Sequence, residues 1–74
     1  MLEKVKEYFE SEYRDTVRGI ERNYVWTTPQ KLVDRAIVNC LAVAQFSQTI
    51  GVTFAEVNAL YDEYKEKLEN LLTE

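Results

Sequence analysis

The feature that most constrains this 74-residue chain is an apolar segment between Pro29 and Ile50. About half of its residues are apolar, and at helical spacing they do not keep to one face. A helix that is apolar on all sides is buried on several sides. In so short a chain, two flanking helices can cover only part of the surface of such a helix. The segment therefore predicts a helical protein that associates with a second copy of itself.

Read as a helix, this segment has two apolar seams that run side by side. The first seam contains Leu32, Ala36, Asn39, Val43, Phe46 and Ile50. The second contains Val33, Ile37, Cys40, Ala44 and Ser47. Steps of three and four residues are typical of an amphipathic helix. The small residues of the second seam predict that a neighbouring helix approaches closely.

The apolar surface continues beyond both seams and suggests where two copies meet. The expected self-association residues are Val38, Asn39, Leu41 and Ala42. Asn39 is polar at a seam position, and two interpretations stay open. It lies partly exposed at the rim of the seam, or it pairs with its counterpart across a symmetric interface and fixes the register.

Local signals mark where the helices start and stop. Thr28 followed by Pro29 is a strong start, with a threonine cap and a proline in the first turn. Gly51 is a C-terminal stop. Thr53 and Glu56 form a capping box, so another helix begins directly after the turn.

These signals predict an all-α fold, a three-helix bundle in which a long, central apolar helix carries the other two and forms a homodimer. The single domain covers residues 1–74, with helices at about 2–23, 29–50 and 54–72. The last helix carries a heptad seam of Phe54, Val57, Tyr61, Tyr64, Leu68 and Leu71. Gly19, inside the first helix, indicates either close approach of another backbone or fraying of the last turn.

Composition argues against catalysis and against bound metal. The chain has no histidine and a single cysteine, Cys40, so a zinc site is not expected. Nucleophilic catalysis usually needs a positioned base, most often an imidazole. Three short helices leave little room for a substrate pocket. We expect a protein that is not an enzyme, with no catalytic, metal-binding or cofactor-binding residues.

Charge and hydropathy narrow the possible partners. The net charge is −4, and residues 52–74 hold six acidic and two basic residues. Phosphate contacts need Lys and Arg, so binding to nucleic acid is disfavoured. No apolar run reaches the length of about 18 residues that indicates a membrane span. The first ten residues carry acids and do not predict a signal peptide. We expect a cytoplasmic protein that does not contact membranes.

Two groups of residues are candidates for binding a partner. Tyr24 and Trp26 lie in the first connection, where aromatic residues either plug the end of a bundle or anchor a partner. The other group consists of acidic residues on the last helix. These residues either form an ordinary solvated face or present their carboxylates to a basic surface of a partner. They are Glu56, Asp62, Glu63 and Glu66.

The stretch from Leu41 to Tyr61 resembles a helix-turn-helix, with Gly51 at its turn. A recognition helix lies against phosphates and should offer basic residues. The corresponding face here has none, and consists of Thr53, Phe54, Ala55, Glu56, Asn58 and Asp62. A DNA-binding regulator is therefore an alternative function, and a structural protein whose only partner is itself is another.

The stretch NYVWTTPQKLVDRAIVNCLAVAQF, residues 23–46, resembles the small, acidic, helical accessory proteins of Gram-positive phages and mobile elements. The shared features are an aromatic loop, a Thr-Pro helix start and a long apolar helix. The resemblance implies a protein that acts by binding another macromolecule, often host machinery, and it assigns no functional residue. We expect a dimeric accessory or inhibitor protein, whose partners are itself and a host protein with a basic surface.

Overall fold

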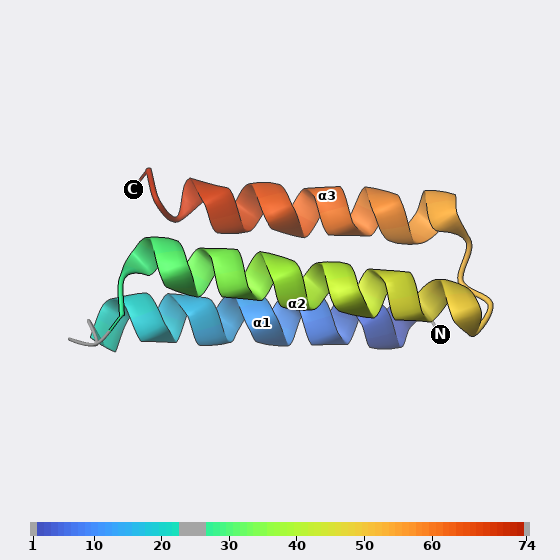
Figure 1. Ribbon diagram of the computed structural model, residues 1–74, viewed down its shortest axis with the longest axis horizontal. Helices are drawn as coiled ribbons and strands as arrows, with labels where there is room; N and C mark the ends of the chain where they lie inside the picture. Colours follow the sequence, from blue (N-terminus) through green and yellow to red (C-terminus); the bar gives the residue numbers. More distant parts are fainter. Residues whose placement is uncertain (1, 23–26, 74) are drawn as a thin grey trace.

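The computed structural model describes residues 2–22 and 27–73, which fold into three helices. Helix α1 spans Leu2–Arg22, α2 spans Pro29–Thr49 and α3 spans Phe54–Asn70. They run side by side along the long axis of a molecule that measures 40 × 19 × 16 Å (Figure 1). The predicted all-α fold with three packed helices is confirmed.

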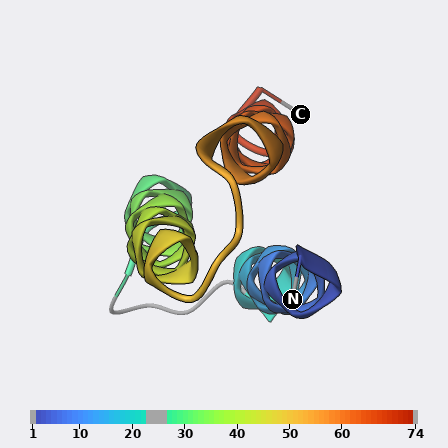
Figure 2. The same ribbon diagram turned by 90° about the vertical axis from the view of Figure 1, so that its right-hand side faces the viewer.

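The three helices surround a shared core. Viewed end-on, they occupy the corners of a triangle (Figure 2), and each helix contacts both others. Phe9 of α1 meets Tyr64 of α3 edge to face, with ring centroids 5.7 Å apart. The sequence predicted that α1 and α3 pack on a central α2. Because α1 also contacts α3, no helix is central in the structure.

The core consists of two clusters of buried side chains. The larger cluster contains Val5, Phe9, Cys40, Ala44, Val52, Val57 and Tyr64. The smaller contains Val33, Ala36 and Leu68. Helix α2 contributes mainly its second predicted seam, in which Ser47 is also buried and donates a hydrogen bond to the Ala44 carbonyl at 2.7 Å. The small residues of this seam bring the neighbouring helices close to α2.

Gly19 lies where α1 and α2 approach each other closely. The residue is buried, and a Cβ atom added to it would lie 3.1 Å from Cδ1 of Leu32. This distance is shorter than an ordinary van der Waals contact between carbons. An alanine would therefore displace the Leu32 side chain. The structure supports close approach as the role of this glycine.

The predicted helix starts are capped as the sequence indicates. The Thr28 hydroxyl accepts a hydrogen bond from the Lys31 amide at 3.2 Å. The Thr53 hydroxyl accepts one from the Glu56 amide at 3.4 Å. Gly51 has φ +103°, a conformation that side-chain-bearing residues rarely adopt. These local contacts set the short turn that returns the chain from α2 to α3.

Candidate interaction surface

The outer face of α2 keeps large apolar side chains in solvent. Val38 is 62% exposed and Leu41 is 41% exposed, and Ala42 beside them is also exposed. The structure places these three predicted self-association residues on one face. Within a single chain, α2 buries only the face that points toward α1 and α3, so the burial on several sides that its sequence predicts is not found there.

Three further apolar residues extend this surface beyond the predicted set. Phe46 is 64% exposed, Ile50 44% and Phe54 65%. The sequence assigned them to apolar seams, which suggested the interior. A helix in a triangular bundle buries one arc of its surface. In α2 the second seam fills that arc, so the first seam falls at its edge.

The surface is also free of charge. No Asp, Glu, Lys or Arg occurs between Ala36 and Ala55. Eight exposed residues of this stretch are here called the uncharged face: Val38, Leu41, Ala42, Gln45, Phe46, Thr49, Ile50 and Phe54. Charged residues are depleted at the centre of protein interfaces. The uncharged face has the composition of such a centre.

A groove of about 310 Å³ opens between α2 and α3 beside this face. Two of the residues that line it, Ala44 and Val57, are buried. The others are Leu41, Gln45 and Gln48 from α2, and Phe54, Asn58 and Tyr61 from α3. Apolar walls with a few amide groups suit an apolar or aromatic side chain of a partner.

Asn39 faces α1 and is half-buried. Its side-chain amide donates a hydrogen bond to a carboxylate oxygen of Glu12 at 3.3 Å. The Tyr8 hydroxyl donates to the same oxygen at 2.9 Å. Asn39 therefore has a partner within its own chain, and no symmetric counterpart is needed to satisfy its amide.

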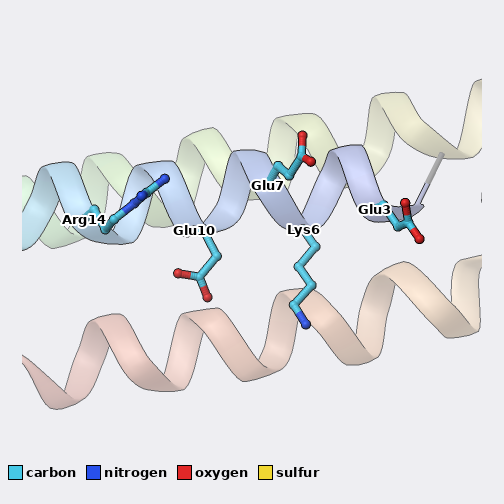
Figure 3. Close-up of a pocket in the computed structure, with 5 residues that line it drawn as sticks. All are labelled: Glu3, Lys6, Glu7, Glu10 and Arg14. Atoms are coloured by element: carbon cyan, nitrogen blue, oxygen red, sulfur yellow. The ribbon is translucent and has the colours of Figure 1, made fainter.

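A second depression, of about 450 Å³, lies along α1 and is lined by charged residues. These are Glu3, Lys6, Glu7, Glu10 and Arg14, of which Lys6 and Glu10 extend toward α3 (Figure 3). Both charge signs occur along the depression, and most of its residues are exposed. The arrangement is typical of a solvated helix surface and does not select one class of ligand.

Glu10 joins α1 to α3. The hydroxyl of the buried Tyr64 donates a hydrogen bond to the Glu10 carboxylate. Nζ of Lys67 lies 4.7 Å from the centroid of the Tyr64 ring, within the range of a cation–π contact. Burial, reinforced by the Glu10 carboxylate, raises the pKa of Tyr64 well above its usual value. These contacts give Glu10 and Tyr64 a structural role.

The acidic candidates on α3 lie in solvent. Glu56, Asp62, Glu63 and Glu66 are all exposed. They spread along three turns of the helix and do not converge on one point. The aromatic candidates Tyr24 and Trp26 lie outside the described residues, so the structure does not place them.

Three observations on the described ranges concern metal binding, the cysteine thiol and the membrane. Residues 2–22 and 27–73 hold no group of three or more His, Cys, Asp or Glu side chains arranged to bind a metal ion. Burial, with a smaller contribution from Glu12, raises the pKa of the Cys40 thiol to about 12, which leaves it protonated at neutral pH. A protonated, buried thiol is a poor nucleophile. None of the helices in the same ranges is both long and apolar enough to cross a membrane.

The corner between α2 and α3 differs from a helix-turn-helix. In that motif the two helices cross at about 90–120°, whereas α2 and α3 run alongside each other (Figure 1). The turn at Gly51 therefore reverses the chain instead of projecting α3 outward.

Comparison with known proteins found no match to this chain among protein-family models, curated proteins or solved structures.

Proposed function

We propose that this chain is a non-enzymatic interaction module that dimerises through the uncharged face and acts by binding another macromolecule. The observation that carries the proposal is the exposure of Val38, Phe46 and Phe54, each more than 60% accessible in a stretch without charge. Contiguous apolar patches of this kind mark interaction sites on soluble proteins.

Burial of this surface is a strong driving force for a chain of this size. Moving a Val, Leu, Ile or Phe side chain fully out of water contributes about 1.5–3 kcal/mol. The accessible surface of the protein is 5211 Å², and a stable interface takes about 800 Å² from each partner, which is about 15% of it. The uncharged face and the adjoining groove both involve α2, the helix through which such an interface would form.

Dimerisation through α2 would leave the opposite side of each copy available. The acidic residues Glu56, Asp62, Glu63 and Glu66 of α3 would stay in solvent and could meet a host protein with a basic surface. The resemblance of residues 23–46 to phage and mobile-element accessory proteins supports this role. It also favours action in the bacterial cytoplasm, as an accessory or inhibitor of host machinery.

A matched pair of alanine substitutions tests the dimer. Ala42 lies in the uncharged face, and Ala59 is exposed on α3 outside it. Both Ala42→Glu and Ala59→Glu add the same charge to an exposed helical position. Light scattering after size-exclusion chromatography should show a dimer for the wild type and for Ala59→Glu, but a monomer for Ala42→Glu. A wild-type monomer at all accessible concentrations would refute dimerisation.

A pull-down from a Gram-positive bacterial lysate, with and without nuclease, tests the second partner. Recovery of a specific host protein from the nuclease-treated half supports the accessory role. Retention that requires nucleic acid, together with salt-sensitive binding to heparin, would favour the DNA-binding alternative instead. Recovery of the bait alone would favour the alternative in which the chain binds only itself.

A further inference from the structure

The outer face of α2 has a flank beside α3 and a flank beside α1. The first carries a groove and the second an exposed aromatic side chain, and the two lie at the same height along the helix. The groove lies on the flank beside α3, where Leu41, Gln45 and Gln48 face it. The flank beside α1 is marked by Asn39, which bonds to α1. Phe46 follows Asn39 by seven residues, nearly two full turns, and therefore lies on the α1 flank. It is 64% exposed there, between Gln45 and Gln48 in sequence.

We propose that the dimer is parallel, with its two-fold axis running parallel to α2 between the two copies. In this arrangement Phe46 of each copy fills the groove between α2 and α3 of the other copy. This inference rests on the proposed dimerisation and specifies how the two copies are arranged. Rotation by 180° about an axis parallel to α2 exchanges the two flanks and leaves heights unchanged. Each Phe46 then faces a groove whose α2 residues span Leu41 to Gln48, and the contact is made twice, as a closed symmetric dimer requires.

An antiparallel dimer would not use these shapes. Its two-fold axis is perpendicular to α2 and brings equivalent flanks together. Phe46 would then face the α1 flank of the second copy, and the groove would face a second groove. Neither copy would offer a side chain to the space of about 310 Å³ between α2 and α3.

Charge favours the parallel arrangement for an independent reason. Helix α3 holds five acidic and two basic residues, a net charge of −3, and α1 holds six acidic and five basic residues, a net charge of −1. The antiparallel dimer places α3 beside α3 of the second copy, so two strongly acidic helices repel each other. The parallel dimer places α3 beside α1, which carries nearly balanced charge. The repulsion across the interface is correspondingly smaller.

Cross-linking distinguishes the two arrangements. Val38 and Thr49 both lie on the uncharged face, 11 residues or about 16 Å apart along the helix. Val38→Cys and Thr49→Cys are prepared separately, one with an affinity tag, and mixed before treatment with a short bismaleimide. The wild type, whose only thiol is the buried Cys40, serves as the blank. The parallel dimer should give 38–38 and 49–49 products, and the antiparallel dimer should give the mixed 38–49 product.

Truncation of Phe46 tests the side chain itself. Phe46→Ala should raise the dimer dissociation constant by about 10-fold or more, as for an interface anchor, measured by sedimentation equilibrium. Leu72→Ala, at a 37% exposed position outside the face, should leave it unchanged. A circular-dichroism melt checks that both variants fold.

The outcomes separate this inference from the function on which it rests. A dimer with like-to-like cross-links that weakens on Phe46→Ala supports both. A dimer that yields the mixed product, or that is insensitive to Phe46→Ala, overturns the parallel arrangement and leaves dimerisation in place. A wild type that stays monomeric overturns both.

Discussion

Replacing Tyr64 with phenylalanine tests the contact that joins α1 to α3. Tyr64 is 1% exposed, and its hydroxyl donates a hydrogen bond to Glu10. Phenylalanine keeps the ring and its edge-to-face contact with Phe9, so the change removes one hydrogen bond without opening a large cavity.

The expected loss follows from the charge and burial of the acceptor. Hydrogen bonds to charged groups contribute about 1.5–3 kcal/mol. Glu10 is only half-buried, so water can replace part of the lost bond, and the lower end of this range, about 1.5 kcal/mol, applies. In a domain of this size each kcal/mol lowers the melting temperature by about 4–8 °C. Tyr64→Phe should therefore melt about 6–12 °C below the wild type.

Thermal unfolding followed by circular dichroism measures this difference, at a protein concentration held constant because dimerisation also affects melting. Tyr8→Phe is the matched control, since Tyr8 also donates a hydrogen bond to a glutamate but lies exposed on α1. Its loss should stay within about 0.5 kcal/mol, as for surface changes. Equal melting temperatures for Tyr64→Phe and the wild type would refute the structural role given to this bond.

Further predictions concern alkaline stability, the α2–α3 turn and the two kinds of apolar position. Folding raises the pKa of Tyr64, and it raises the pKa of the Cys40 thiol to about 12. As pH rises, the unfolded chain therefore loses these protons before the folded chain does. Urea titrations should show that the free energy of unfolding falls as pH rises above about 9. This fall should be smaller in Tyr64→Phe, and a fall of equal size would contradict its origin. Gly51→Ala should cost about 1–2 kcal/mol because φ is positive, with Gly51→Asn losing less in the same urea titrations. Phe9→Ala should cost about 3–5 kcal/mol, whereas Phe46→Ala should barely change protomer stability in the monomeric Ala42→Glu background; a large loss there would mean that Phe46 belongs to the core.

The starts of α2 and α3 could be predicted because their causes are local. The Thr28 and Thr53 hydroxyls bond to amides three residues further along the chain, and nothing outside the first turn is needed to form those bonds. Gly51 likewise acts on its own backbone angle. The three-helix fold follows from these signals and from the apolar repeats between them.

The candidate surface could be predicted only in part. The surplus of apolar residues around Val38, Leu41 and Ala42 was visible in the sequence, and the structure places all three in solvent. The spacing instead places Phe46 in the first seam of α2, and Phe54 at the start of the α3 seam, whose later members Val57, Tyr64 and Leu68 are buried. Apolar spacing identifies which residues share a face of a helix, but it does not determine which of two adjacent seams turns inward.

The sequence by itself thus determined where α2 and α3 begin, because hydrogen bonds and backbone angles within a few residues decide that. Only the tertiary structure decided which arc of α2 is covered. That arc depends on where α1 and α3 lie around it, and so on contacts between residues distant in sequence. The bond from Asn39 to Glu12, across 27 residues, is one such contact. Packing of Phe9 against Tyr64 is another, because it brings α1 and α3 together and leaves the opposite side of α2 in solvent.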